Sequence, residues 1–456
     1  MKVKEIIEAT DGKLICGNIE NECGDFCRDT RIIKNGDTYV GIKGENFDGN
    51  TLWEEAVKNG AKTLILQGVD VKEIANVNVI KVEDTIQALA DIATYKRNLY
   101  RNNLKVVGVT GSVGKTSTKD IIANVISQKF TTLKTQGNNN NDIGLPFTIF
   151  RLKDEKAAVI EMGMNHSGEI SKLTKIAKPD IAVITNVGTS HIGNLGSREN
   201  ILKAKLEILD GMENKILVIN NDNDMLHKFN LENKEVQVYT YGIENKSDVM
   251  AEDIILNENS SEFICNLKEN KFKINVPVGG IHFVYNALCA ATVGSLMGLS
   301  IEEIQKGIST FELTKKRMDI TELKNGVKII NDSYNASFES MQASLKYLSR
   351  LENTRKIAVL GDMFELGEFS KQLHEKVGEE VAKNKIDILI CSGENSKYIA
   401  ENAKQNGMNP ETIYYFENKN DIEEFIKKIW KENDSILFKA SNGMRFFEIV
   451  EKLIKD

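Results

Sequence analysis

The chain has 456 residues, of which 41% are hydrophobic and 27% are charged, with 33 Gly and 4 Pro. This composition excludes collagen-like, proline-rich and disordered proteins, and the length suits about three domains of roughly 150 residues each. Lys and Arg total 59 against 66 Asp and Glu, a net charge of -7, so we expect no nucleic-acid partner, and any anionic substrate must be held by local cations, metal ions or backbone amides.

The N-terminus and the cysteines indicate a reducing compartment. Residues 1–8 carry charges where a signal peptide has an apolar run, and no stretch approaches 18 consecutive apolar residues. The six cysteines are scattered, and Cys16, Cys23 and Cys27 do not match a zinc-binding spacing. We therefore expect a cytoplasmic protein that does not insert into a membrane. As a separate expectation, we take it to be a monomer.

The first part of the chain predicts a small α/β domain, which we place at residues 1–102. Strand-like apolar runs alternate with helix-like segments, at 37–43, 52–60, 63–66, 77–82 and 85–100. The polar residues 101–103 then mark a boundary.

Residues 103–314 predict a central domain with a mostly parallel sheet covered by helices on both faces. Four short apolar runs predict its strands, at 104–110, 157–163, 181–187 and 215–220. Residues 229–278 alternate polar and apolar side chains, which predicts antiparallel strands. A helix of small residues at 286–292 closes the domain.

Residues 315–456 predict a third, Rossmann-like α/β domain, with strands at 328–332, 356–362, 386–393 and 434–440. The dinucleotide-binding pattern G-x-G-x-x-G is absent, so this domain is not expected to bind NAD or FAD. Because open sheets bind ligands at the carboxyl ends of their strands, we expect Gly361–Asp362 and Lys439–Ser441 to face a ligand cleft.

A glycine-rich loop between a strand and a helix is the sharpest motif of the chain. It reads Thr110-Gly111-Ser112-Val113-Gly114-Lys115-Thr116-Ser117, with the helix expected near Thr118. Amides of such a loop point at phosphate oxygens, while the lysine neutralises phosphate and the following threonine can bind Mg²⁺. Val109 occupies the position of the first glycine in the strict G-x-x-x-x-G-K-[ST] pattern.

Further polar residues follow the predicted strands of the central domain. Residues 136–146 form an asparagine-rich run that an ordinary loop would also allow. Glu161 ends one strand and His191 follows another, which places both at the sheet edge that carries Lys115. Lys205 lies in a helical stretch, where a solvent-facing lysine is the default interpretation.

These motifs together resemble the Mur ligases of peptidoglycan synthesis over nearly the whole chain. The resemblance is carried by Thr110–Thr116, Gly137–Pro146, Glu161–Ile170, Asn186–His191, Tyr285–Leu288, Asp332–Ala336 and Leu360–Glu368. The last two motifs, with Asp29–Asp37 and Lys43–Gly49, are most similar to the member that adds D-Ala-D-Ala. The Asp-Asn-Pro-Arg signature of the member that adds the third residue is absent.

The resemblance implies a role for each matching residue. It assigns the uridine part of a UDP-sugar to Asp29, Thr30, Arg31, Lys43 and Gly44. It assigns ATP and a first Mg²⁺ to the glycine-rich loop with Lys115 and Thr116, and adds Asn140 and Asn141 near the phosphates. It assigns a second Mg²⁺ to Glu161, His191 and Lys205, with Lys205 carbamylated by CO₂. Asn286 matches an adenine contact, and Arg317 and Asp332 match contacts to phosphate and ribose.

The activity that the resemblance implies is an ATP-dependent ligation of D-Ala-D-Ala to UDP-N-acetylmuramoyl-tripeptide through an acyl phosphate. The alternatives are a ligase for D-Ala-D-Ser or D-Ala-D-lactate, a folate-type polyglutamyl ligase, and a non-catalytic ATP-binding paralogue. Four positions depart from the usual family pattern: Asn50, Phe283, Phe338 and Ala440.

Overall fold

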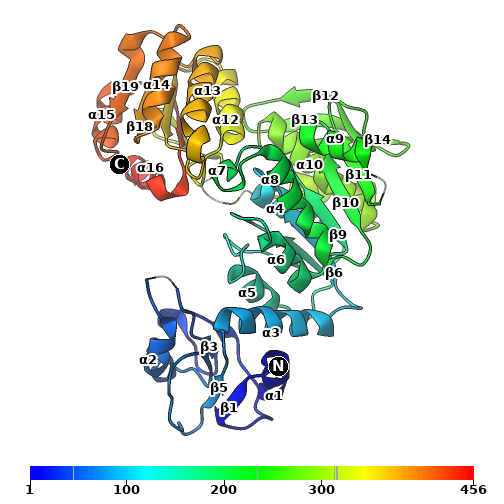
Figure 1. The fold of residues 1–456 in the computed structure, drawn as a ribbon. Coiled ribbons are helices and arrows are strands. Elements are labelled where there is room, and N and C mark those ends of the chain that lie inside the picture. Colours follow the sequence, from blue (N-terminus) through cyan, green and yellow to red (C-terminus); the bar gives the residue numbers. More distant parts are fainter. Residues whose placement is uncertain (45, 234, 313, 315–316, 456) are drawn as a thin grey trace.

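The computed structural model describes residues 1–44, 46–233, 235–312, 314 and 317–455. Three sheets follow one another along the chain, each with its own helices (Figure 1). We call the units around them the N-terminal, central and C-terminal lobes. The expected domain limits at 102/103 and 314/315 fall between the sheets, but residues 315 and 316 lie outside the described part of the chain, so these limits stay predictions.

The N-terminal lobe contains a five-stranded sheet of order β1-β5-β4-β3-β2, parallel except for the β1–β5 pair. Its short strands β1 and β2 escaped prediction because each lacks a run of buried side chains. The elements are α1 (Val3–Thr10), β1 (Lys13–Cys16), β2 (Phe26–Cys27), β3 (Thr38–Val40), α2 (Trp53–Lys58), β4 (Thr63–Leu66), β5 (Asn78–Lys81) and α3 (Thr85–Leu99), with 3-10 turns at Thr30–Ile32 and Gly49–Leu52.

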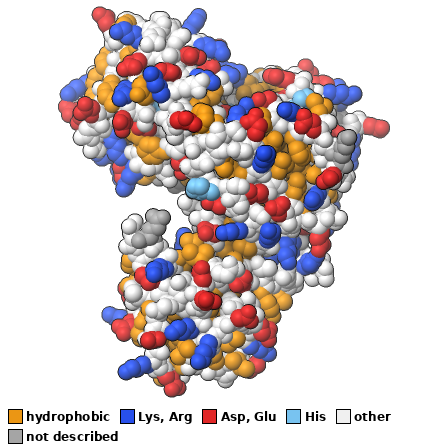
Figure 2. Space-filling view, viewed as in Figure 1, with side chains coloured by type: hydrophobic (Ala, Val, Ile, Leu, Met, Phe, Trp, Pro, Cys, Tyr) orange, Lys and Arg blue, Asp and Glu red, His pale blue; other side chains and the backbone are white. Residues whose placement is uncertain are grey.

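Helix α3 joins the N-terminal lobe to the central lobe. The guanidinium of Arg97, only 3% exposed, donates to the carbonyl oxygens of Ala177 (2.8 Å) and Lys178 (3.1 Å). A cation at these last carbonyls of α6 (Glu169–Ala177) also suits the helix dipole. In Figure 2 the N-terminal lobe, at the bottom, is separated by a recess from the C-terminal lobe above it.

The central lobe contains a nine-stranded sheet of order β14-β13-β12-β11-β10-β9-β6-β8-β7. Helices α4, α10 and α11 pack together, and α6 packs with α3 and α8. The elements are β6 (Lys105–Thr110), α4 (Lys115–Ile126), β7 (Thr132–Lys134), α5 (Gly144–Phe150), β8 (Ala157–Glu161), α6, β9 (Ile181–Ile184), α7 (Ile192–Leu195), α8 (Arg198–Leu206), a 3-10 turn (Glu207–Gly211), β10 (Ile216–Asn220), α9 (Asp224–Glu232), β11 (Gln237–Gly242), β12 (Val249–Leu256), β13 (Ser261–Leu267), β14 (Asn270–Val276), α10 (Ile281–Leu296) and α11 (Ile301–Ser309).

The prediction of antiparallel strands over residues 229–278 is only partly right. Strands β12, β13 and β14 do form an antiparallel meander. Strand β11, however, pairs in parallel with both β10 and β12, and residues 229–232 belong to helix α9. Burial alternates along β13, but along β11 it only rises from Gln237 to Gly242, so the pattern predicted for the whole segment does not apply to β11.

The C-terminal lobe contains a six-stranded sheet of order β15-β16-β20-β17-β18-β19, in which only β15 is antiparallel to its neighbour. This agrees with the predicted Rossmann-like α/β arrangement. The elements are β15 (Asp319–Glu322), β16 (Lys328–Asn331), α12 (Phe338–Arg350), β17 (Lys356–Gly361), α13 (Ser370–Lys383), β18 (Ile388–Ser392), α14 (Ser396–Gln405), β19 (Ile413–Phe416), α15 (Asp421–Ile429), β20 (Ser435–Lys439) and α16 (Phe447–Lys455), with 3-10 turns at Gly367–Phe369, Pro410–Thr412 and Asn442–Met444.

Two properties expected from the composition are a surface of mixed charge and helices too short or too polar to span a membrane. On the face seen in Figure 2, acidic and basic side chains are interspersed and no continuous basic surface is visible. Across the part of the chain that the structure describes, no helix is long and apolar enough to cross a membrane.

Candidate active site

A cavity of about 610 Å³ lies where the central and C-terminal lobes meet. One wall consists of the carboxyl ends of β6, β8, β9, β10 and β11 together with α10. The other wall comes from the C-terminal lobe, at residues 332–344, 364–366 and 439–443. Parallel sheets bind ligands at this end of their strands, so the cavity is where a ligand of the central sheet is expected.

The glycine-rich loop and the start of α4 form the floor of the cavity. Helix α4 begins at Lys115, three residues earlier than predicted, and no side chain caps its N-terminus at Gly114. The first amides of a helix have no partner within the helix and attract anions. Gly111 has φ +151°, and a Cβ atom there would lie 1.9 Å from the Thr185 hydroxyl, so no larger residue fits.

Lys115 folds back over this loop. Its ammonium donates to the carbonyl oxygens of Gly111 (2.7 Å) and Ser112 (3.4 Å). Burial lowers the pKa of Lys115, while the nearby carboxylate of Glu161 acts in the opposite direction. A half-buried cation with only carbonyl partners at a cavity wall is well placed to gain from an anionic ligand.

Four polar side chains meet beside Lys115. The hydroxyl of Thr116 donates to Glu161 Oε2 (2.9 Å) and accepts from Arg317 Nη2 (2.9 Å), while Asn140 donates to Glu161 Oε1 (2.8 Å). Glu161 is 2% exposed. The guanidinium of Arg317 also stacks on the ring of Tyr334, 4.1 Å from its centroid. The structure thus brings together Thr116, Asn140, Glu161 and Arg317 from distant parts of the chain.

The donor atoms at this position fit a hard cation. Thr116 and Glu161 offer oxygen atoms next to the first amides of α4, as Mg²⁺ prefers. Among the residues that the structure describes, no group of three or more His, Cys, Asp and Glu is arranged to hold a metal ion. A cation bound here would therefore depend on further oxygen ligands from a nucleotide or from a modified side chain.

Lys205 is buried rather than solvent-facing, so the default interpretation of its sequence context is wrong. It lies in the last turn of α8 and is 1% exposed, and its ammonium has no hydrogen bond or ion pair to any described residue. Burial, and then the charge of Lys115, lowers its pKa well below the usual value. An unpaired buried ammonium is costly, which favours the neutral amine.

His191 lies at the edge of the cavity and contacts the C-terminal lobe. It has φ +63° and precedes α7. Its Nδ1 atom pairs with the carboxylate of Glu365, and this contact lowers the pKa of Glu365. The backbone amide of Gly193 also donates to the Glu365 carbonyl (3.0 Å). A contact between the two lobes therefore fixes the orientation of the imidazole.

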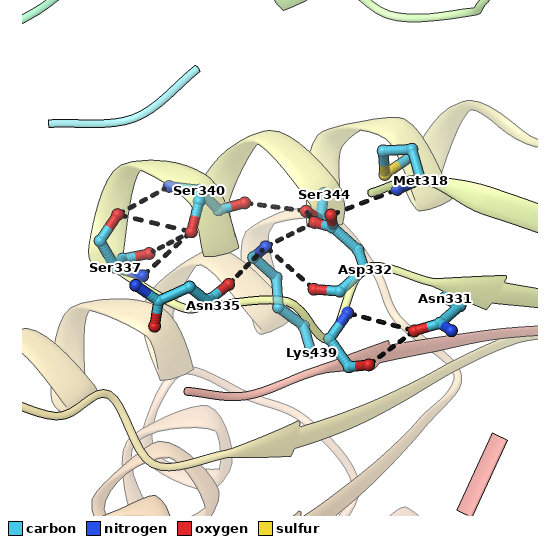
Figure 3. A network of polar contacts seen from close by, with 9 residues as sticks. Met318, Asn331, Asp332, Asn335, Ser337, Ser340, Ser344 and Lys439 are labelled. Atoms are coloured by element: carbon cyan, nitrogen blue, oxygen red, sulfur yellow. Dashed lines mark hydrogen bonds and ion pairs between the residues drawn. The ribbon is translucent and has the colours of Figure 1, made fainter. Parts of the chain in front are cut away.

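Asp332 is the centre of a polar network on the C-terminal wall (Figure 3). Its Oδ2 atom accepts from the ammonium of Lys439 and from Ser344 (2.6 Å), and its Oδ1 atom accepts from the amide of Met318 (3.3 Å). Lys439 also donates to the carbonyl of Asn335 (3.3 Å). The network fixes strand β20 and helix α12 around Asp332.

Helix α10 supplies another side of the cavity. The side chain of Asn286 accepts from the Thr118 hydroxyl (3.0 Å), which ties α10 to α4. Beside it, burial lowers the pKa of His282 to about 4. Phe283, one of the four departures from the family pattern, is 2% exposed and packs its ring 4.3 Å from that of His282.

The N-terminal candidates do not line this cavity. The carboxylate of Asp29 pairs with the exposed Arg31, whose hydrogen bonds lower the pKa of Asp29 to about 2. Thr30 donates to Glu55 (2.8 Å). The backbone of Lys43 forms an isolated antiparallel β-bridge with that of Asp48, and the amide of Gly44 donates to the carbonyl of Phe47 (2.8 Å). These residues form a separate group on the N-terminal lobe.

Two candidate residues, Asp362 and Asn141, use their side chains in structural contacts. Asp362 does not line the cavity, because its buried carboxylate accepts from the amides of Asn395 (3.0 Å) and Ser396 (2.7 Å) at the start of α14. Asn141 lines the cavity, but its side chain accepts from the amide of Gly144 (2.8 Å) at the start of α5. Lys439 and Ser441 do face the cavity, as predicted.

The other departures from the family pattern lie in packed positions. Asn50 is buried, donating to Asp48 (2.8 Å) and accepting from the amide of Gln67 (2.9 Å). Phe338 is the first residue of α12, a position that also suits proline. Ala440 is fully buried and its methyl group fills space beside Gly361.

Comparison with known proteins places these features in one family. Three family models match the chain: "Mur ligase family, catalytic domain" at residues 28–97, "Mur ligase middle domain" at 109–294, and "Mur ligase, glutamate ligase domain" at 316–442. The UDP-N-acetylmuramoyl-tripeptide--D-alanyl-D-alanine ligase of Bacillus subtilis (strain 168) is 37% identical over 99% of this chain and 98% of that protein. The protein of the same name from Escherichia coli (strain K12) is 34% identical over 82% of each.

Solved structures show the same arrangement. A crystal structure of MurF from Acinetobacter baumannii superposes with a TM-score of 0.90 at 29% identity, over 100% of this chain and 99% of that one. MurF ligase from Thermotoga maritima, solved in complex with ADP, has a TM-score of 0.82 at 30% identity, over 94% and 97% of the two chains.

Proposed function

Because this chain belongs to the Mur ligase family, we propose that it joins D-Ala-D-Ala to UDP-N-acetylmuramoyl-tripeptide in the synthesis of peptidoglycan precursors, with ATP as the energy source. The observation that carries the proposal is the cavity at the N-terminus of α4, where Lys115, Thr116 and Glu161 meet residues of the C-terminal lobe. The names of the relatives support the two substrates, and the ADP complex of a related structure supports the nucleotide.

The proposed reaction has two steps. The terminal carboxylate of the tripeptide attacks the γ-phosphorus of ATP, which forms an acyl phosphate and releases ADP. The free amine of D-Ala-D-Ala then attacks the acyl carbon, loses a proton and displaces inorganic phosphate. Because two anions must approach each other, this chain's contribution is to position them and to offset their charge.

The phosphates are assigned to the amides that begin α4 and to Lys115. In this arrangement the ammonium of Lys115 exchanges its two carbonyl partners for phosphate oxygens, which gives stronger, charge-assisted hydrogen bonds. Arg317 is close enough to Thr116 to act on the same group. The family resemblance assigns Asn286 to adenine and Asp332 to ribose, and both residues line the cavity.

We assign one Mg²⁺ to Thr116 with the nucleotide, and a second to Glu161, His191 and Lys205. Bound Mg²⁺ would neutralise charge on the phosphate oxygens. Lys205 can serve only as a carbamate, which forms when its neutral amine attacks CO₂ and loses a proton. The buried, unpaired state of Lys205 and its lowered pKa support this assignment, since only the neutral amine is nucleophilic.

The remaining substrates are assigned to the outer lobes. We propose that Asp29, Thr30, Arg31, Lys43 and Gly44 bind the uridine part of the sugar nucleotide, and that the C-terminal lobe binds the dipeptide. Asn140 and Asn141 are assigned to positions near the phosphates. A protein with three ligand-binding lobes would close around its substrates, and we propose that it does so as a cytoplasmic monomer.

The test is product formation. We expect purified protein with ATP, Mg²⁺, UDP-N-acetylmuramoyl-tripeptide and D-Ala-D-Ala to yield the pentapeptide by mass spectrometry. Parallel reactions with D-Ala-D-Ser and D-Ala-D-lactate measure the acceptor preference. Absence of product from all three acceptors, by a folded protein, would contradict a ligase function.

A further inference from the structure

The segment that follows β9 is bonded to the phosphate loop. The side chain of Asn186 accepts from the amides of Ser112 (3.1 Å) and Val113 (3.0 Å). The amide of Gly188 donates to the Ser112 hydroxyl (2.9 Å), and Ser190 donates to the Ser112 carbonyl (3.3 Å). The conformation of residues 111–114 therefore depends on where residues 186–190 lie.

A carboxylate of the C-terminal lobe holds the same segment from the other side. Glu339, in the first turn of α12, accepts from the amide of Thr189 (2.7 Å) and from its hydroxyl (3.2 Å). The two residues are 150 positions apart in the sequence. Charged acceptors make the stronger kind of hydrogen bond, so this contact is a well-defined link between the two lobes.

The shape of the segment is adapted to this carboxylate. A Cβ atom on Gly188 would lie 2.5 Å from Cδ of Glu339 and 2.6 Å from its Oε1. Gly188 is not among the residues with positive φ, so its backbone conformation would accept alanine, and the close approach of Glu339 is what requires glycine here.

Helix α12 also contacts the Asp332 network. Ser344 of α12 donates to Asp332, and Ser337 and Ser340 form the N-terminal cap of the helix next to Asn335 (Figure 3). Helix α12 therefore has two attachments at the cavity, one to Asp332 in its own lobe and one, through Glu339, to the loop that approaches Ser112.

We propose that Glu339 is a positioning residue that couples docking of the C-terminal lobe to the conformation of the phosphate loop, and so to nucleotide affinity. This inference rests on the proposed function, because it takes residues 110–116 as the site of the ATP phosphates. Glu339 acts through Thr189, Gly188 and Ser112. Loss of Glu339 should weaken nucleotide binding more than it lowers the turnover rate of the enzyme with nucleotide bound.

The test compares nucleotide binding and kinetics in a set of variants. For Glu339→Ala we expect the Kd of ADP and the KM of ATP to rise by roughly 10-fold, with a smaller change in kcat. Glu339→Gln keeps an acceptor for the Thr189 amide and should restore most of the affinity. Glu352→Gln removes one exposed charge on the loop that follows α12 and should bind like the wild type.

A second variant tests the same contact from the central lobe. Gly188→Ala should displace the Glu339 carboxylate and weaken ADP binding to a similar degree. In the double variant Glu339→Ala, Gly188→Ala, the methyl group no longer meets a carboxylate, so the second change should add little. Fully additive losses, or Glu339→Ala binding ADP as tightly as the wild type, would overturn the proposal.

The two proposals fail in different ways. If the wild-type protein does not bind ADP or ATP, the proposed function is wrong. If the wild type binds and every variant binds equally, only the role of Glu339 is wrong. Thermal unfolding checks that each variant is folded, and small-angle X-ray scattering should show a larger average radius for Glu339→Ala with ADP bound than for the wild type.

Discussion

The hydroxyl of Thr116 donates a 2.9 Å hydrogen bond to Glu161, although Thr116 lies in the first turn of α4 and Glu161 ends β8. The register of the sheet explains the contact, because Val109 at the end of β6 pairs with Glu161. The loop that follows β6 then returns over the end of β8. Two side chains with oxygen atoms of the kind that Mg²⁺ prefers therefore meet beside the first amides of α4.

Glu161→Gln should weaken divalent cation binding. The substitution keeps the size of the side chain and an acceptor for Thr116 but removes the negative charge. We expect the affinity of Mn²⁺ in the presence of a non-hydrolysable ATP analogue to fall by at least about 10-fold, measured by electron paramagnetic resonance. Glu199→Gln, an exposed position on α8, is the matched control. Unchanged Mn²⁺ affinity in Glu161→Gln would remove this residue from the metal site.

Lys115→Ala should reduce turnover without unfolding the protein. The ammonium makes hydrogen bonds only to carbonyl oxygens, and the buried carboxylate of Glu161 keeps its donors Thr116 and Asn140 when Lys115 is removed. We expect kcat to fall by about 10²–10³-fold, as for the loss of one group that stabilises transition-state charge. Steady-state ADP release measures this, and circular dichroism checks the fold. Turnover within a factor of two of the wild type would contradict the phosphate assignment.

Lys205 should carry a carbamate when CO₂ is present. Its low exposure and depressed pKa keep the amine neutral and able to attack CO₂. With isotope-labelled CO₂, we expect a carbamate carbon signal in nuclear magnetic resonance spectra of the wild type and of Lys203→Ala, whose exposed side chain lies on the same helix. The signal should vanish in Lys205→Ala. A crystal at high CO₂ with no density beyond the Lys205 amine would refute the assignment.

His374 should make the C-terminal lobe less stable in mild acid. It is fully buried, its Nδ1 hydrogen is donated to the Ser370 carbonyl (2.7 Å), and its Nε2 accepts from the Met363 amide (3.0 Å). Burial lowers its pKa. Between the folded and unfolded pKa values the unfolded chain therefore binds more protons, so stability falls as pH drops below about 6.5.

The measurement is the free energy of unfolding in urea between pH 7.5 and pH 5.5. For His374→Gln, which cannot titrate, the loss on acidification should be smaller than for the wild type, by at most about 1.4 kcal/mol per pH unit. His166→Gln, at an exposed histidine, should follow the wild type. Parallel pH dependence in all three proteins would show that His374 does not contribute.

Much of the architecture was accessible from the sequence because buried parallel strands are short apolar runs. Strands β6, β8, β9 and β10 were predicted in this way. Strand β11 was assigned the wrong kind of pairing, because the alternation of the later strand β13 was extended to β11, whose burial does not alternate. The start of α4 was placed at Thr118, since a glycine-rich loop does not reveal which of its residues is the first in helical conformation.

The candidate site was only partly predictable. Motifs identified Lys115, Thr116, Glu161 and His191, which the sheet brings to one edge. Burial of Lys205 depends on how α8 packs, and helical spacing gave no sign of it, although the family resemblance had assigned this lysine to a metal site. Glu339 acts through a contact between lobes, and such pairs have no sequence spacing that would reveal them. Asp362 was expected to face the cleft because it ends a strand. Its carboxylate instead accepts from the first amides of the neighbouring helix α14.

The most direct test of the central claim is ADP release by wild-type protein and Lys115→Ala, measured with each substrate omitted in turn. We predict that rapid release requires ATP, UDP-N-acetylmuramoyl-tripeptide and D-Ala-D-Ala together, and that Lys115→Ala loses it. Rapid ADP release without the tripeptide, or equal release by Lys115→Ala, would contradict the account of a ligase that activates a carboxylate at the N-terminus of α4.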